Sequence, residues 1–268
     1  MMWFHRAFWL GLVRGITELL PLSSRGHARL FQEILSEEAY RVSYLYGFTS
    51  LAVLLAGLIF FRKELKNLVV EIFKKKNYRI VLNALISGLP IAILTLLLNK
   101  NIAENDLLSS LWIVAAGFGV MGILLIMFNK LPQMKKLADY KEISVADAAC
   151  VGLVDLFALV PGFSRFGLSL VGSKIIGLDT KNALKYSYLA SIPSLVLITI
   201  FSFCNGNALS FMASDFWQNI LALVATFAAS MFVLAVCKKY FAMKSNMKGL
   251  AWYLIFAAIM ILIFELLK

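Results

Sequence analysis

Long apolar stretches alternate with short polar segments along the whole chain. Six of these stretches run for roughly 18–22 residues, which as helix gives roughly 27–33 Å and is enough to cross the hydrocarbon core of a bilayer. They lie at 43–61, 80–98, 107–128, 184–203, 216–237 and 250–267. This pattern predicts six transmembrane helices.

Two further apolar regions, 7–35 and 144–178, are interrupted near their middle by proline, glycine, serine and arginine. Such a break does not suit a simple span, and non-helical backbone at membrane depth is tolerated only where protein or a watery cavity surrounds it. We therefore expect each region to form a re-entrant helical hairpin, which enters and leaves the membrane on one face.

The loops between the spans differ sharply in charge. Lysine and arginine gather in the loops 62–79, 129–143 and 238–249, whereas loop 99–106 has only Lys100 and loop 204–215 has neither residue type. The positive-inside rule makes the basic loops cytoplasmic. The two broken regions must then enter the membrane from opposite faces, which is typical of an inverted-topology repeat.

A repeat is also visible in the residues themselves. Pro21–Arg25 and Pro161–Arg165 share the pattern P-x-x-S-R, and the tripeptide at Gly11 recurs at Gly152. The second copies lie about half the chain length downstream. We predict one membrane domain, 1–268, built from pseudo-symmetric halves 1–135 and 136–268 whose broken segments meet near the midplane.

The composition agrees with this fold class. The chain of 268 residues is 61% hydrophobic and 15% charged, with a mean hydropathy of +0.82, against about 45–50% and about 25% in soluble domains. The net charge of +11 is explained by orienting loops, so we expect no nucleic-acid partner. The three cysteines lack disulfide or metal spacing.

Ionisable and hydroxyl side chains are concentrated in both broken regions. They are Arg14, Thr17, Glu18, Ser23, Ser24, Arg25 and His27 in the first, and Asp155, Ser164, Arg165 and Ser169 in the second. Such groups are costly at membrane depth unless they face each other or a ligand. A carboxylate, hydroxyls and an imidazole can supply a base, a nucleophile and a proton shuttle, and arginine suits phosphate oxygens. The regions predict a site for a phosphorylated ligand whose hydrophobic part lies in the bilayer.

Both regions also resemble the signatures of a known family. Gly15–His27 is similar to G-x-T-E-F-L-P-x-S-S-x-G-H, and Pro161–Ser169 to P-G-x-S-R-S-x-x-T, of the undecaprenyl-diphosphate phosphatase (bacitracin-resistance) family. The resemblance covers essentially the whole chain in motif order, length and helix count. It implies a phosphatase of the bacterial inner membrane that removes the terminal phosphate of undecaprenyl diphosphate, with its site open to the periplasmic side. The product, undecaprenyl phosphate, is a carrier lipid recycled for peptidoglycan and other envelope polymers.

The resemblance also implies roles for single residues. Glu18 would be an acidic catalytic or metal-coordinating group, Ser24 the nucleophile or a close phosphate ligand, His27 the proton-transfer partner and Arg165 the phosphate clamp. The implied cofactor is a divalent cation, Mg²⁺ or Ca²⁺. The expected substrate-binding residues are Thr17, Ser23, Arg25, Gly26, Ser164, Gly167, Ser169, Arg14 and Asp155.

Two positions depart from the family signatures. Arg14 stands where the family has an acid or glutamine, four residues before Glu18. One interpretation pairs Arg14 with Glu18 on one helix face. Another uses the repeat, in which Arg14 and Asp155 are equivalent, and predicts an Arg14–Asp155 ion pair or an Asp155 that replaces the acid. At the other position, Phe166 replaces a serine beside the expected phosphate clamp.

Two rival functions stay open on the sequence alone. A polyprenyl-phosphate translocase would use the same inverted repeat to expose its site alternately to the two leaflets. A catalytically weak paralogue would bind another lipid phosphate with little hydrolysis. Phosphate release separates a phosphatase from both. The expected partners are a polyprenyl diphosphate and membrane lipids, and a homodimer stays open.

Overall fold

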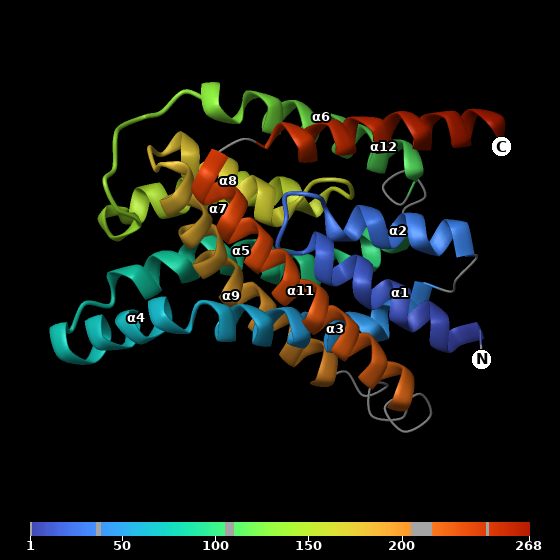
Figure 1. Ribbon diagram of the computed structural model, residues 1–268, viewed down its shortest axis with the longest axis horizontal. Coiled ribbons are helices and arrows are strands. Elements are labelled where there is room, and N and C mark those ends of the chain that lie inside the picture. Colours follow the sequence, from blue (N-terminus) through green and yellow to red (C-terminus); the bar gives the residue numbers. More distant parts are fainter. Residues whose placement is uncertain (1, 36–38, 105–109, 205–215, 245–246) are drawn as a thin grey trace.

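The computed structural model of the protein describes residues 2–35, 39–104, 110–204, 216–244 and 247–268 (Figure 1). These residues contain helices and no strand, which confirms the all-α prediction. The helices are α1 (Met2–Thr17), α2 (Ser24–Leu35), α3 (Ala39–Phe60), α4 (Arg62–Lys75), α5 (Arg79–Glu104), α6 (Leu111–Met127), α7 (Val145–Asp155), α8 (Arg165–Ile175), α9 (Thr180–Cys204), α11 (Phe216–Lys244) and α12 (Lys248–Leu267). Short 3-10 turns occupy Phe128–Lys130, Tyr140–Glu142 and Leu156–Leu159.

The chain is a polytopic helical membrane protein by the length and hydropathy of its helices. Five helical segments of the described residues are long and apolar enough to cross a bilayer: Arg79–Leu98, Leu111–Lys130, Thr180–Cys204, Phe216–Cys237 and Lys248–Leu267. They coincide with five of the six predicted spans. The remaining prediction, 43–61, coincides with Leu45–Phe60, which meets the criterion only together with the following helix, across a bend of 77°.

The basic segment after Phe60 is helical, so the prediction of a loop over 62–79 is wrong for most of its length. Arg62–Lys75 forms α4, which carries charged residues beside the half-buried Leu65 and Leu68 that pack on the core. Such a mixed helix has one face for the protein and another for water or headgroups. Its charges explain why it turns away from α3 instead of continuing the span.

The helices pack in two matching sets. Helix α1 packs against α11 and α7 packs against α5, while α3 also packs on α11 and α9 on α5. Two further contacts join corresponding helices of the two sets: α3 packs against α9, and α6 packs against α12. In Figure 1, α6 and α12 lie side by side along the top, and both termini lie at the right, opposite α4.

The contact between α1 and α11 relies on small residues. A Cβ atom at Gly11 would lie 2.6 Å from the carbonyl oxygen of Ala222, and one at Gly15 would lie 2.5 Å from that of Thr226. The Thr226 hydroxyl donates to the Gly11 carbonyl at 2.9 Å. A small-xxx-small pattern of this kind lets two backbones approach closely in a membrane, and it fixes the helix that ends beside the candidate site.

Candidate active site

The first break lies between α1 and α2 and ends in a strained serine. Ser23 has a φ of 58°, a left-handed conformation that is uncommon for residues other than glycine and is often found at functional sites. Its hydroxyl oxygen accepts a hydrogen bond from the Gly26 amide at 3.2 Å. Ser23 therefore caps α2 and leaves Ser24 as the first residue of that helix.

The second break, between α7 and α8, also ends in a capping serine, although Ser164 has an ordinary extended backbone with a φ of −93°. The Ser164 hydroxyl accepts from the Gly167 amide at 3.1 Å and so caps α8, whose first residue is Arg165. It also donates to the Leu20 carbonyl at 3.2 Å, which ties the two breaks together. Gly162 has a φ of 99°, and a Cβ there would lie 2.5 Å from the Val114 carbonyl oxygen. Only glycine fits this turn without strain.

The caps correct the register of the repeat. The P-x-x-S-R match aligns Ser24 with Ser164, but the capping bonds make Ser23 the equivalent of Ser164 and Ser24 the equivalent of Arg165. The second turn holds one more residue between its proline and its cap. An alignment of the two prolines is therefore shifted by one position from an alignment of the two capping serines.

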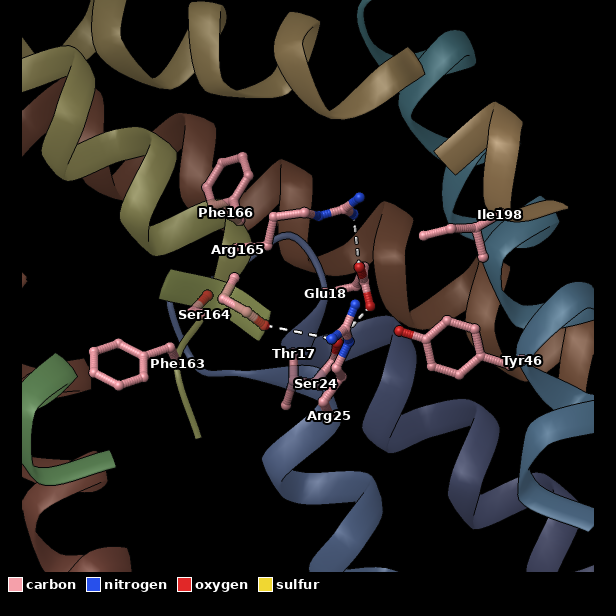
Figure 2. Close-up of a pocket in the computed structure, with 11 residues that line it drawn as sticks. Thr17, Glu18, Ser24, Arg25, Tyr46, Phe163, Ser164, Arg165, Phe166 and Ile198 are labelled. Carbon is pink, nitrogen blue, oxygen red and sulfur yellow. Dashed lines mark hydrogen bonds and ion pairs between the residues drawn. The ribbon is translucent and has the colours of Figure 1, made fainter. Parts of the chain in front are cut away.

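A pocket lies between the starts of α2 and α8. Figure 2 shows its lining side chains, which come from both breaks, from the helix ends beside them, and from α3 and α9. The lining residues are Thr17, Glu18, Ser24, Arg25, Tyr46, Ala158, Phe163, Ser164, Arg165, Phe166 and Ile198. Exposed amides at a helix N-terminus favour anions, so the position between two such ends suits a negatively charged ligand.

Glu18 makes the central contacts of this pocket. The Ser24 hydroxyl donates to Glu18 Oε2 at 2.5 Å. Arg165 Nη2 donates to Glu18 Oε1 at 2.8 Å, and Arg14 Nη2 lies 3.1 Å from Oε2. The carboxylate is buried, with 8% of the residue exposed, so these three groups satisfy a charge that water does not reach freely.

Further polar contacts hold the arginines in place. Arg165 Nη1 donates to the Ser194 hydroxyl at 2.5 Å. Arg25, on α2, donates from Nη2 to the hydroxyl of Thr95, on α5, at 2.7 Å. With Arg14, three guanidinium groups act on one carboxylate, two of them in direct contact with it, so the site carries an excess of positive charge. Guanidinium groups match phosphate oxygens in shape and charge, and a phosphate group is therefore the ligand that this arrangement favours.

The structure brings together six of the predicted site residues at the pocket, namely Thr17, Glu18, Ser24, Arg25, Ser164 and Arg165. Ser23, Gly26 and Gly167 lie in the caps instead. Ser169 is buried on α8, and its hydroxyl has no hydrogen-bond partner among the described residues. The catalytic roles of these residues stay predictions.

His27 does not line the pocket. Its Nδ1 lies 2.9 Å from the Ser23 carbonyl oxygen, and its Nε2 lies 2.8 Å from the Tyr253 hydroxyl. The imidazole stacks on the Tyr253 ring, with 5.7 Å between centroids. The structure thus places His27 against α12, away from Glu18 and Ser24, and its role in proton transfer stays a prediction.

Arg14 pairs with Glu18, as the interpretation within one helix predicts. The described residues contain no Arg14–Asp155 ion pair, so that prediction is wrong. The reason is that Arg14 lies one helical turn before Glu18, while Asp155 is buried at the end of α7 with no partner for its Oδ1. That Asp155 replaces an acid stays a prediction. Phe166 is buried in an apolar cluster with Leu19 and other residues, which explains a large side chain there.

Sequence reasoning missed the residues that the spans contribute. Tyr46 lines the pocket from α3, while Thr95 and Ser194 hold the two arginines from α5 and α9. Each is a polar residue within an otherwise apolar span, which is a signal of function or of polar contact in membranes. The sequence offers many such residues, so the signal does not say which of them meet.

The donor set does not suit a divalent cation held by the protein. The described residues contain no group of three histidine, cysteine, aspartate or glutamate side chains close enough to share an ion. Both oxygens of Glu18 already contact cationic side chains. Magnesium and calcium take oxygen ligands, carboxylates above all among protein side chains, whereas the described residues offer one carboxylate here and it is already paired with arginines.

Comparisons with known proteins agree with the signatures. A family model described as bacitracin resistance protein BacA matches residues 7–260. A relative named undecaprenyl-diphosphatase, from Thermosipho melanesiensis, is 34% identical and covers 93% of this chain and 95% of its own length. Relatives of the same name from Oceanobacillus iheyensis and Thermosipho africanus are 33% and 39% identical; the first match covers 96% of this chain and 95% of that relative, and the second covers 70% and 73%.

Proposed function

Because the chain belongs to the bacitracin resistance protein BacA family, we propose that it performs the reaction that gives its relatives their name. It is an undecaprenyl-diphosphatase, a membrane hydrolase that converts undecaprenyl diphosphate to undecaprenyl phosphate and inorganic phosphate. The observation that carries the proposal at the level of chemistry is the hydrogen bond from Ser24 to Glu18. It joins a nucleophile to a base beside two phosphate-binding arginines.

In the proposed mechanism the Ser24 hydroxyl attacks the terminal phosphorus of the diphosphate. Glu18 accepts the hydroxyl proton as the new P–O bond forms, and the bond to the bridging oxygen breaks, which releases undecaprenyl phosphate. Water then displaces the phosphate from Ser24, and the proton on Glu18 returns to the serine oxygen. Arg165 and Arg25 offset the negative charge of the phosphate throughout.

We also propose the finer membrane arrangement. The α1–α2 and α7–α8 pairs are re-entrant hairpins of an inverted repeat with halves 1–135 and 136–268, and the matching helix contacts of the two halves support this. The basic α4 lies opposite both termini (Figure 1), which supports a cytoplasmic side at α4 and a site open to the periplasm in a bacterial inner membrane. A membrane-impermeant thiol reagent should then label the exposed Cys204 in intact cells. Labelling that occurs only after lysis would indicate the opposite orientation.

Phosphate release by the purified full chain in detergent, with undecaprenyl diphosphate as substrate, tests the function. Ser24→Ala should lower kcat by about 10³-fold or more, as for other removed nucleophiles. Ser173→Ala is the matched control, because Ser173 is buried on α8 and its hydroxyl has no partner among the described residues. It should leave the rate unchanged. A Ser24→Ala protein that still releases phosphate at the wild-type rate would refute the role of Ser24. No release by folded wild-type protein would refute the function and direct attention to lipid translocation.

A further inference from the structure

Arg14 is a fully buried cation directly behind the catalytic carboxylate. Only 1% of the residue is exposed, and its Nη2 lies 3.1 Å from Glu18 Oε2 and 3.3 Å from the Ser50 hydroxyl. The guanidinium lies over the Tyr46 ring, 3.5 Å from the centroid, an arrangement that stabilises a cation next to an aromatic face. Helix α1 and helix α3 therefore hold the charge of Arg14 in one place.

Two other nitrogens of Arg14, Nε and Nη1, have no hydrogen-bond partner among the described residues. Burying donors in this state is unfavourable, and such groups in a folded protein call for an explanation. The ion pair with Glu18 gives a reason to bury the guanidinium in spite of this cost, because it fixes a positive charge 3.1 Å from Glu18 Oε2. Arg14 itself does not line the pocket, so it acts on the reaction through Glu18.

The contacts of Glu18 leave little place for a metal ion. Oε2 is shared by Arg14 and Ser24, and Oε1 is 2.8 Å from Arg165. A magnesium ion binds carboxylate oxygens at about 2.0–2.1 Å. To reach either oxygen it would displace a guanidinium or lie beside one, and the repulsion between a divalent and a monovalent cation at such distances is strong in a buried site.

We propose that Arg14 takes the place of a divalent cation at Glu18, and that hydrolysis by this chain needs no divalent cation. The inference rests on the proposed function and adds to it which group neutralises the charge of the Glu18 carboxylate. Arg14 is a positioning residue that keeps Glu18 ionised and aimed at the Ser24 hydroxyl. Arg25 and Arg165 carry the charge of the phosphate groups from the pocket side.

Two measurements on the wild-type full chain in detergent test the inference. The first is the rate of phosphate release with excess EDTA and with excess Mg²⁺ or Ca²⁺, and we expect the rates to agree within about twofold. The second is the titration of the protein with Mn²⁺, followed by electron paramagnetic resonance, where we expect no bound ion that depends on Glu18. A rate that EDTA abolishes and Mg²⁺ restores would overturn the inference. So would one equivalent of bound Mn²⁺ that disappears in Glu18→Gln.

The two proposals fail in different ways. If no condition yields phosphate, the proposed function fails, and the Mn²⁺ titration still decides the inference. If phosphate is released only with a cation, the function stands and the inference fails.

Variants at position 14 test the positioning role. Arg14→Gln should lower kcat by about 10-fold or more with little change in KM, since the residue does not line the pocket. Arg14→Lys should recover most of the loss by restoring the charge. Arg29→Gln is the matched control, because Arg29 pairs with Glu33 at 3.1 Å outside the pocket; it should leave both constants unchanged. An Arg14→Gln protein with wild-type kcat, or one that Arg14→Lys does not improve, would refute the role. Should either variant fail to fold, the wild-type measurements above decide.

Discussion

Replacing Glu18 by glutamine removes the proposed base and changes almost nothing in size. Ser24 donates to Oε2 and Arg165 donates to Oε1, so both oxygens act as acceptors. A glutamine has one oxygen and one NH₂ group. If the NH₂ group faces Arg165, the hydrogen bond from that guanidinium is lost. If it faces Ser24, the amide donates to the serine oxygen, and the serine hydroxyl no longer donates to residue 18.

The expected loss of rate follows from the role of the base. General-base catalysis contributes about 10²- to 10⁴-fold, which corresponds to about 2.7–5.4 kcal/mol in the activation free energy. The folded state should also suffer, because Arg14 and Arg165 lose the charge that pairs with them. Removing one partner of a buried ion pair costs about 3–5 kcal/mol, so the Glu18→Gln protein should unfold at a lower temperature than the wild type.

The assay is phosphate release under saturating undecaprenyl diphosphate, beside thermal unfolding in the same detergent. Glu33→Gln is the matched control, because Glu33 lies on α2, pairs with Arg29 and Lys268, and is outside the pocket. It should keep the wild-type kcat. A folded Glu18→Gln protein that keeps more than about a tenth of the wild-type kcat would refute the reasoning, since the serine would then lose its proton without this carboxylate.

Two further predictions concern stability. Gly167→Ala should lower both Tm and kcat, because a Cβ there would lie 2.9 Å from the Pro21 side chain and push the two breaks apart. The control is Gly119→Ala on α6, where a Cβ would meet no atom within 4 Å, and it should change neither quantity. Equal Tm values for the two variants would contradict this packing. Burial raises the pKa of Asp147, but the hydrogen bond from Lys135 and other contacts outweigh it, so its pKa lies below the ordinary 3.8. The stabilisation by this group is present above about pH 4 and is lost as the pH falls through the lowered pKa, so Asp147→Asn should have a lower Tm than wild type at pH 7, and this difference should shrink on acidification. A difference in Tm that does not depend on pH would contradict the ionic contribution.

The strongest signals in the sequence led to the main features of the structure. Apolar length located five spans, and the prolines and glycines located both breaks. The density of polar groups in those breaks predicted that Glu18, Ser24 and Arg165 belong to one site, and their contacts place them together. These features depend on local composition, which a sequence displays directly.

The rest depends on contacts between distant segments. His27 lies three residues after Ser24, but Tyr253 on α12 supplies the hydroxyl next to its Nε2, and no local pattern announces that partner. The direction of α4 depends on where its charges can meet water. The sequence allowed two partners for Arg14, Glu18 and Asp155. Arg14 pairs with Glu18, because a spacing of four residues along the chain brings the two side chains together without a contact between distant segments.

The capping register decides which residues of the proposed repeat are equivalent at the pocket. Serine caps place Ser24 and Arg165 at equivalent positions, the first residues of α2 and α8, so the two helix starts bring the proposed nucleophile and a cation to one pocket. The same sequence separation that relates the caps also relates Gly11 to Gly152, so two independent features support this register. In it the counterpart of Glu18 is Leu159, whose side chain cannot accept a proton. In the proposed mechanism the attacking group and its base therefore belong to the first break and the start of α2, and the start of α8 contributes Arg165, whose charge would stabilise the phosphate.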